Sequence, residues 1–272
     1  MGRLELRVRD MDTQLEYYTK GLGLTPLADE PGAVTLGLSE TPVVRLSEAK
    51  DLRAAPRGSA GLFHTALVFD TEAQLAGVLA NMAQHYGSTY IGSGDHLVSQ
   101  AFYFTDPEGN GVEIYHDRPR DQWTWMGDQV QMDTLFIDPS QFLSQHLEET
   151  PGLDLTGELG HVHLQVGDIA SARDFYVDAL GFDQTFLMNG QALFVSAGGY
   201  HHHMAMNVWN SAGAPPRSST LGMGVVDIVV PAEDDLGATA ERLRAAGFTP
   251  TFDGRTLAVG DPWNNEIRLT VG

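Results

Sequence analysis

The chain repeats itself, and this internal repeat limits the folds that it can adopt. Residues 2–24 (GRLELRVRDMDTQLEYYTKGLGL) align without gaps to residues 160–182 (GHVHLQVGDIASARDFYVDALGF). Both segments predict a short strand with alternating faces, then an aspartate, Asp10 or Asp168, that caps an amphipathic helix. The sequence therefore predicts a fold assembled from copies of one unit.

Two further units follow the same plan with weaker similarity. One begins with GLFHTALVF and ends with DPEGNGVEIY, and the other begins with MGVVDIVV and ends with DPWNNEIRLTV. In both, Asp-Pro followed by Gly or Asn marks a turn between two strands, and a helix is predicted upstream. We place the four units, each a strand, a helix and about three further strands, at 2–48, 60–117, 159–210 and 221–272.

The units group into two halves of the sequence. A chain of 272 residues is long enough for two domains of ordinary size. We predict one domain at 1–117, a connector at 118–158 and a second domain at 159–272. The connector carries Trp123 and Trp125, which we expect to be buried against the surface of a domain.

Composition narrows the class of protein. The absence of cysteine excludes a disulfide framework and a thiolate metal site. No apolar run approaches the roughly 18 residues of a membrane helix, and the first residues lack a secretory signal pattern, so we expect a soluble, cytoplasmic protein. The net charge of -20 opposes binding to nucleic acid or to an anionic membrane. A homo-oligomer is compatible with this composition.

Strand alternation separates the residues that face a helix from those that face the other way. In the first strand of the third unit, Val162, Leu164 and Val166 form the apolar face, which leaves His161 and His163 on the inner face of a curled sheet.

The same alternation places one histidine and one glutamate on the inner face of the second unit. His64 lies on its first strand, and Glu113 lies on its last strand between the apolar Val112 and Ile114. The inner positions of the first and fourth units instead hold charges of both signs, which either pair with one another or face solvent: Arg3, Glu5, Arg7, Asp227, Glu266 and Arg268.

Four βαβββ units in one chain resemble the vicinal oxygen chelate superfamily, and within it the two-domain catechol 2,3-dioxygenases. The resemblance covers nearly the whole chain. It implies an α+β fold in which four βαβββ modules form two half-open barrels. The superfamily also includes glyoxalase I, fosfomycin-resistance enzymes and bleomycin-binding proteins, so the fold alone does not fix the function.

The resemblance also implies a set of metal ligands. In this superfamily the ligands come from the first and last strands of paired modules, and extradiol dioxygenases use two histidines and one glutamate. The matching positions form a complete set, His64, His161 and Glu113, only when the second and third modules are combined. We therefore predict a crossed pairing of modules two with three and one with four. His163, two residues past the matching position, is the alternative to His161.

Two imidazoles and one carboxylate on one face of a metal form the triad suited to non-haem Fe(II) and dioxygen. The resemblance implies Fe(II) as the cofactor, with Mn(II) left open as the alternative. It implies a catechol-type aromatic substrate and O2, with the ring opened beside its two hydroxyl groups. The proton transfers in such a reaction need a residue whose pKa lies near neutrality, and histidine is the natural choice.

The segment GYHHHMAMN resembles the extradiol pattern His-x-x-Ala-aromatic, which carries the acid–base histidine. His202 fits best because it lies three residues before Ala205, although Met206 replaces the aromatic residue. His203 has the opposite parity and is an alternative, as is His201. The run of histidines is also compatible with a metal-binding tract or a solvated loop.

A second resemblance lies in SGDHLVSQAFYFTDPEGNGVEIY. Extradiol enzymes place a tyrosine four residues before the proline of this turn, and Tyr103 lies four residues before Pro107. Its hydroxyl group is predicted to bond a substrate oxygen, with His96 close by; the alternative for Tyr103 is a core aromatic residue. The predicted catalytic residues are thus His202, His203, Tyr103 and His96.

Two other classes of function stay open at this point. A glyoxalase-like isomerase or a conjugating enzyme of the same superfamily would use a four-ligand site, commonly with two carboxylates, whereas the complete set here offers one. A non-catalytic small-molecule binding or resistance protein would lack the ligands.

Overall fold

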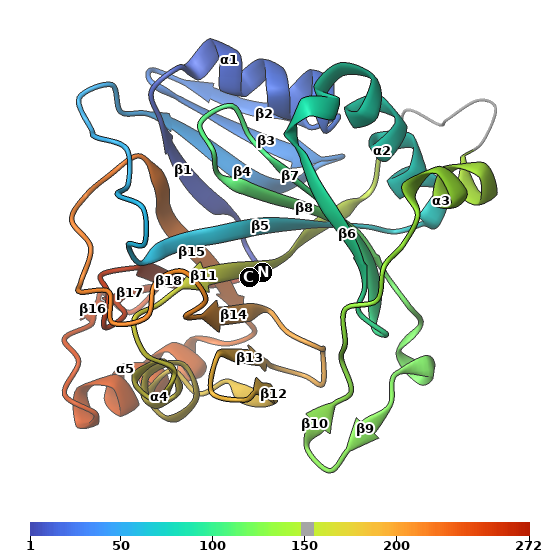
Figure 1. Ribbon diagram of the computed structural model, residues 1–272. Helices are drawn as coiled ribbons and strands as arrows, with labels where there is room; N and C mark the ends of the chain where they lie inside the picture. Colours follow the sequence, from blue (N-terminus) through green and yellow to red (C-terminus); the bar gives the residue numbers. More distant parts are fainter. Residues whose placement is uncertain (148–154) are drawn as a thin grey trace.

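The computed structural model describes residues 1–147 and 155–272 and contains the four predicted modules in order (Figure 1). The first comprises β1 (Leu4–Val8), α1 (Met11–Glu16) and its π-helical continuation η1 (Tyr17–Gly21), then β2 (Thr25–Glu30), β3 (Ala33–Leu38) and β4 (Thr41–Glu48). The second comprises β5 (Gly61–Phe69), α2 (Glu72–Tyr86), the 3-10 turn η2 (Gly87–Thr89), β6 (Tyr90–Asp95), β7 (Ser99–Thr105) and β8 (Gly111–Asp117).

The second half repeats this order. The third module comprises β11 (Gly157–Gln165), α4 (Ile169–Arg173) with its π-helical continuation η4 (Asp174–Ala179), β12 (Asp183–Met188), β13 (Ala192–Ser196) and β14 (Met204–Asn207). The fourth comprises β15 (Gly222–Val230), α5 (Glu233–Ala245), β16 (Thr251–Phe252), β17 (Thr256–Gly260) and β18 (Glu266–Val271).

The modules pair in the crossed arrangement that the ligand positions predicted. One eight-stranded sheet has the order β16-β17-β18-β15-β1-β4-β3-β2 and joins modules one and four; the other has the order β12-β13-β14-β11-β5-β8-β7-β6 and joins modules two and three. The joints are the antiparallel pairs β1–β15 and β5–β11. The α+β fold with two half-open barrels is thereby confirmed. Each sheet takes strands from both halves of the sequence, and the assignment of 1–117 and 159–272 as domains stays a prediction.

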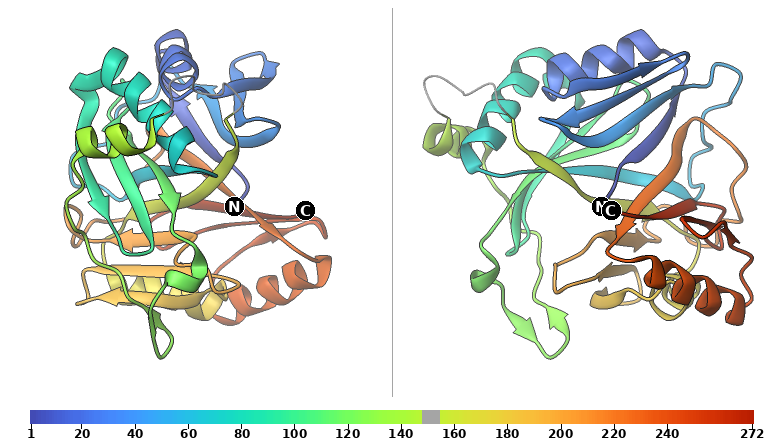
Figure 2. Two further views of the ribbon diagram at one scale, coloured as in Figure 1. Left: turned by 90° about the vertical axis from the view of Figure 1, so that its right-hand side faces the viewer. Right: turned by 180° about the vertical axis from the view of Figure 1, so that it is seen from behind.

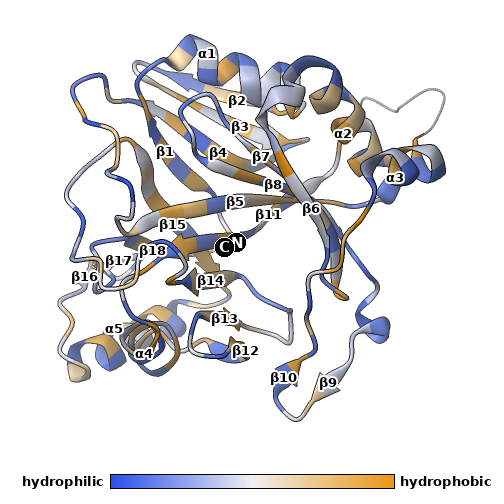
Figure 3. Cartoon of the chain, in the orientation of Figure 1, coloured by the Kyte–Doolittle hydropathy of each residue, from blue (hydrophilic) through white to orange (hydrophobic). Residues whose placement is uncertain are grey.

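The helices start where the sequence predicted. The carboxylate of Asp10 accepts a hydrogen bond from the Thr13 amide, and that of Asp168 accepts one from the Ser171 amide, so both aspartates satisfy a free N–H of a first helical turn. One apolar cluster draws on both sheets and on the helices that cover them. Figure 3 shows this division, with apolar residues along the strands and polar residues on the surrounding loops.

Consecutive modules are tied together by a buried tyrosine. The Tyr18 hydroxyl donates to Asp106 Oδ2 at 3.3 Å, and the Tyr176 hydroxyl donates to Asp261 Oδ2 at 3.0 Å. In each case the tyrosine lies on a helix of one sheet and the aspartate lies in a turn of the other sheet. These two equivalent bonds hold the two sheets in a fixed relation, which the repeat alone did not reveal.

The connector is more structured than a plain linker. It contains the 3-10 turn η3 (Arg120–Gln122), a hairpin of β9 (Trp125–Met126) and β10 (Gln129–Val130), and α3 (Pro139–His146). Its residues 148–154 lie outside the described residues. Trp123 is buried as predicted, but Trp125 is 40% exposed, so its predicted burial is wrong. The reason is that the hairpin projects from the body of the molecule (Figures 1 and 2).

The two ends of the chain meet near the middle of the molecule, where β1 and β18 flank β15 in one sheet (Figure 2). Within the described ranges, no helix combines the length and the apolar character needed to cross a membrane. The cytoplasmic location and the oligomeric state stay predictions.

The inner face of the first sheet carries ion pairs in place of metal ligands. The Asp227 carboxylate contacts Arg268 at 2.6 Å and Arg3 at 3.3 Å, and its side chain is 13% exposed. On the neighbouring strands, the Ser47 hydroxyl donates to the Glu5 carboxylate. The interpretation that the opposite charges pair with one another is confirmed for Asp227 and its two arginines.

We expect Asp227→Asn to destabilise the protein, because the two half-buried guanidinium groups would lose the carboxylate that they share. The free energy of unfolding should fall by about 1–3 kcal/mol. Urea denaturation of both proteins measures this difference. An unchanged midpoint would show that the pairs contribute nothing to the joint between modules one and four.

Candidate metal centre

Three neighbouring strands position the predicted ligands on the inner face of the second sheet. The central strand β5 pairs in parallel with β8 and antiparallel with β11, and Ala66 lies opposite both Glu113 and His161. His64 lies two residues before Ala66 and therefore on the same face. The small side chain of Ala66 leaves space above it for the glutamate and the histidines.

The three predicted ligand atoms converge. His64 Nε2 lies 3.0 Å from Glu113 Oε2, and His161 Nε2 lies 3.2 Å from the same oxygen. The two histidine nitrogens lie 3.4 Å apart. The expectation that these three side chains reach a common point is confirmed, and together they form a buried group that could hold a metal ion.

The spacing of the three atoms fits one face of an octahedral ion. Ligands bound at about 2.1 Å and at right angles to one another lie about 3.0 Å apart. The three measured separations of 3.0, 3.2 and 3.4 Å are close to that value. Two neutral imidazoles and a carboxylate are also donors that Fe(II) and Mn(II) accept.

Burial shapes the charge of the cluster. Burial alone would raise the pKa of Glu113, but the adjacent His161 and His64 imidazoles hold this pKa well below its usual range. Burial lowers the pKa of His161 to about 4 despite the glutamate beside it. The cluster therefore combines an ionised carboxylate with an uncharged His161, and a buried negative charge of this kind favours a bound cation.

His163, the alternative to His161, has a different environment. Its Nε2 lies 3.0 Å from the amide nitrogen of Asn207, and its ring contacts Phe63 and Trp209. It lies opposite His64 across the β5–β11 joint but is not a member of the converging group. The geometry therefore favours His161 over His163 as the metal ligand.

The histidine run places its three members in three different environments. The His202 ring lies 4.1 Å from the His161 ring, with Phe194 packed at 5.0 Å on it. His201 is fully buried and contacts Asp117 and His202. His203 accepts a hydrogen bond from the Ala197 amide and packs on the Tyr200 ring, away from the ligand atoms.

Tyr103 and His96 meet beside the cluster. The Tyr103 hydroxyl and His96 Nε2 are 2.6 Å apart, and the Tyr103 ring lies 5.6 Å from that of His64. His96 Nδ1 lies 2.9 Å from the Asp133 carbonyl oxygen, which can only accept, so His96 carries its proton on Nδ1. His96 Nε2 therefore has a lone pair and accepts the hydrogen bond that the Tyr103 hydroxyl donates. Burial and then the charge on Glu113 raise the pKa of the Tyr103 phenol, which therefore keeps its proton.

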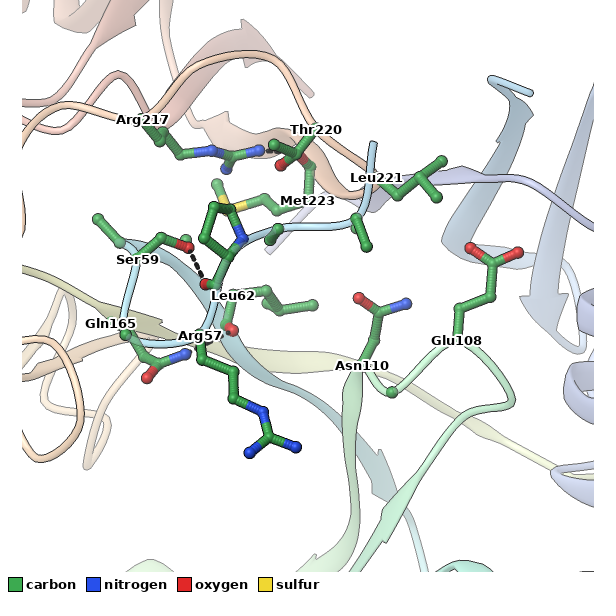
Figure 4. Close-up of a pocket in the computed structure, with 18 of the residues that line it drawn as sticks. Arg57, Ser59, Leu62, Glu108, Asn110, Gln165, Arg217, Thr220, Leu221 and Met223 are labelled. Carbon is green, nitrogen blue, oxygen red and sulfur yellow. Dashed lines mark hydrogen bonds between the residues drawn. The ribbon is translucent and has the colours of Figure 1, made fainter. Parts of the chain in front are cut away.

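The two described cavities lie elsewhere. A cavity of about 830 Å³ opens where β1, β5 and β15 approach one another, and Figure 4 shows Arg57, Glu108, Asn110 and Arg217 around it. A second, of about 550 Å³, lies at the other end of β5. Neither lining includes a candidate ligand or catalytic residue. The chemistry of the residues, and not the volume of a cavity, locates the site.

The sequence analysis missed Tyr115, Asp117 and Tyr200, which surround the cluster. Tyr115 and Asp117 follow Glu113 at intervals of two along β8, so strand alternation already placed them on the inner face. The Tyr200 hydroxyl bonds both of them, at 2.8 Å each.

The buried histidines make the metal-free protein sensitive to acid. Burial, the largest cause, lowers the pKa of His161 and His203 to about 4 and holds those of His163 and His202 well below their usual value. Between about pH 6.5 and pH 4 the unfolded chain therefore binds more protons than the folded one.

We expect the free energy of unfolding to fall as the pH falls through this range, by up to about 1.4 kcal/mol per pH unit for each such histidine. Urea denaturation of the metal-free protein at several pH values measures this fall in the free energy of unfolding. A stability that stays level over the range would contradict the burial of these imidazoles in neutral form.

Comparisons with known proteins identify the family of the chain. The family model of the Glyoxalase/Bleomycin resistance protein/Dioxygenase superfamily matches residues 1–114 and 158–269. The chain is 33% identical to a catechol-2,3-dioxygenase of Bacillus subtilis (strain 168) over 96% of its own length and 93% of that protein.

Solved structures share the fold at lower identity. Over 100% of this chain and 92% of that one, glyoxalase I from Zea mays has a TM-score of 0.58 and 16% identity. The cppA protein from Streptococcus pneumoniae TIGR4 has a TM-score of 0.61 and 11% identity over 99% of this chain and 96% of that one. On the match of its family model across both halves, the chain belongs to the glyoxalase/bleomycin resistance protein/dioxygenase superfamily.

Proposed function

We propose that this protein is an extradiol ring-cleavage dioxygenase that opens a catechol-type ring with O2, using Fe(II) held by His64, His161 and Glu113. The observation that carries the proposal is the convergence of two imidazoles and one carboxylate, all buried, at separations that fit one face of a metal ion.

The relative named catechol-2,3-dioxygenase supports the same reaction, because its similarity extends over nearly the full length of both chains. The glyoxalase I structure shares the fold at 16% identity, which supports no particular chemistry. A glyoxalase-like site would also need a further ligand, whereas His163 is held by Asn207 instead of joining the cluster.

The metal contributes what the side chains lack. Fe(II), when bound, supplies a path for electrons between the aromatic ring and dioxygen, and its charge favours the ionised form of a catechol. His64 and His161 would hold it as neutral donors and Glu113 as an anion. In the overall reaction both oxygen atoms of O2 enter the ring-opened product, so no further reductant is consumed.

The walls beside the cluster suit a flat aromatic substrate. Phe63 and Trp209 pack edge to face at 5.4 Å, and Phe194 packs against both His163 and His202. Phe186 packs on Phe194 at 5.7 Å, so the second module, through Phe63, and the third module together supply aromatic rings beside the cluster. Such a lining would hold an aromatic ring by stacking and would exclude water from the reacting carbons.

His202 is the residue best placed to move protons. Its ring adjoins that of His161 and is buried, and burial followed by the charges of neighbouring imidazoles lowers its pKa well below the usual value. It is therefore a neutral base before the reaction, able to take a proton from a catechol hydroxyl and to return it to a leaving oxygen. His203 faces away from this place and is proposed only as the alternative.

Tyr103 would bind the substrate on the opposite side. Its hydroxyl donates a hydrogen bond to His96 Nε2, so its oxygen keeps lone pairs that can accept a hydrogen bond from a substrate hydroxyl. Tyr103 and His202 thus approach the cluster from different modules, one from β7 and the other from the segment before β14.

We expect one Fe(II) per chain after anaerobic reconstitution, measured by elemental analysis. Glu113→Gln should lower the bound iron well below one, because the anionic ligand becomes a neutral amide of the same shape. Asp227→Asn, which changes a comparable carboxylate in the other sheet, is the matched control and should keep one iron. Near-zero iron in the unaltered protein, or two irons, would count against the triad.

We expect His202→Ala to leave iron binding nearly intact while it slows ring opening by about 10²- to 10⁴-fold, as for the loss of a general acid–base. Catechol turnover is measured by the coloured ring-opened product and by uptake of O2. His85→Ala, which removes an exposed histidine of α2, is the control and should react at the normal rate. A normal rate in His202→Ala would transfer the role to His201 or His203.

A further inference from the structure

Asp117 lies at the end of β8, four residues after Glu113, on the wall of the 550 Å³ cavity. Its two carboxylate oxygens have different partners. Oδ1 lies 2.8 Å from His201 Nε2, and Oδ2 accepts the hydroxyl proton of Tyr200 at 2.8 Å. From each partner a line of hydrogen bonds runs inward to the candidate metal centre.

The first line passes through two histidines. A carboxylate can only accept, so His201 carries its proton on Nε2 and its Nδ1 has a lone pair. His201 Nδ1 lies 2.7 Å from His202 Nδ1, so the second nitrogen must donate. The neutral His202 ring then has its lone pair on Nε2, the nitrogen that its bond to His201 leaves free. Both rings are buried, which keeps water from competing for these positions.

The second line passes through two tyrosines. Because Tyr200 donates to Asp117, its oxygen accepts the proton of the Tyr115 hydroxyl at 2.8 Å. The Tyr115 oxygen can then only accept at His161 Nδ1, 3.3 Å away, which favours a lone pair on His161 Nε2. The Glu113 carboxylate, 3.2 Å from that Nε2, can also only accept, so in the metal-free protein it competes for the same proton.

We propose that Asp117 is a positioning residue. Through His201 its carboxylate fixes the tautomer of His202 as a base, and through Tyr200 it holds the Tyr115 hydroxyl as an acceptor beside the metal ligand His161. The proposal rests on the function proposed above for the roles of these two histidines. The tautomer of His202 itself follows from the hydrogen bonds alone, in a protein without metal or substrate.

A glycine supports the second line independently. A Cβ atom at position 160 would coincide with the Tyr115 hydroxyl and crowd its ring. The Tyr115 hydroxyl can reach His161 only because the residue before that histidine has no side chain. The backbone of Gly160 is not among those with positive φ, so the requirement is for space and not for an unusual conformation.

The test is the tautomer of each histidine in metal-free protein labelled with 15N in its histidines, read from nitrogen–proton correlation spectra at about pH 8, where ordinary imidazoles are neutral. In the unaltered protein, His202 should carry the proton on Nδ1. An asparagine side chain offers one acceptor and one donor, so Asp117→Asn should shift the His202 tautomer or lower the affinity for Co(II). An unshifted His202 tautomer together with an unchanged Co(II) affinity would overturn the proposal.

Tyr200→Phe separates the two lines, because it removes the tyrosine hydroxyl and keeps the bond between Asp117 and His201. We expect the His202 tautomer to stay unchanged and the affinity for Co(II) alone to fall by about 10- to 100-fold. Asp227→Asn is the control and should change neither the His202 tautomer nor the Co(II) affinity. An unchanged Co(II) affinity in Tyr200→Phe would overturn the second line.

These measurements need no turnover. If the His202 tautomer depends on Asp117 as expected and the protein fails to open catechol, the proposed function is wrong and the role of Asp117 stands. If the protein opens catechol and neither its His202 tautomer nor its Co(II) affinity depends on Asp117, the positioning role is wrong and the proposed function stands.

Discussion

The antiparallel pairing of β5 with β11 is the contact on which the candidate site depends. His64 and His161 lie 97 residues apart in the chain, and only this joint brings them onto one face of one sheet. Glu113 reaches the same place through the parallel pairing of β8 with β5. A sequential pairing of modules would have separated the histidines. The ligand set therefore requires the crossed topology. The ligand set was predicted from the residues at matching positions of the modules, and the topology is seen in the hydrogen bonds between strands.

The two sheets follow one plan and differ in what fills their inner faces. In one sheet, the Asp227 carboxylate is paired with two arginines, Arg3 and Arg268, so its negative charge is offset within the protein. In the other, the Glu113 carboxylate lies between His64 and His161, and burial lowers the pKa of His161 to about 4, which keeps that imidazole in neutral form. The first arrangement needs no bound ion and stabilises the contact between β1 and β15. The second retains a buried negative charge, which a divalent cation would offset.

Much of this could be predicted from the sequence, because a repeat with strand alternation fixes which side chains share a face. The alternation correctly separated His161 from Val162 and Glu113 from Ile114. It could not choose among the three consecutive histidines, since the segment before β14 bends and gives each a separate environment. The Asp117 network also escaped, because hydrogen bonds between Tyr115, Tyr200 and His201 depend on distances across strands. The exposure of Trp125 follows from a hairpin outside the repeat, where no alternation applied.

The central claim is that one metal ion binds where modules two and three meet. Anomalous diffraction from crystals soaked anaerobically in Fe(II) or Mn(II) tests this most directly. The account predicts one anomalous peak per chain, roughly 2.0–2.2 Å from the Nε2 atoms of His64 and His161 and from a carboxylate oxygen of Glu113. A peak bound by His163 in place of His161, a peak on the inner face of the other sheet, or the absence of any peak in a metal-loaded crystal would contradict it.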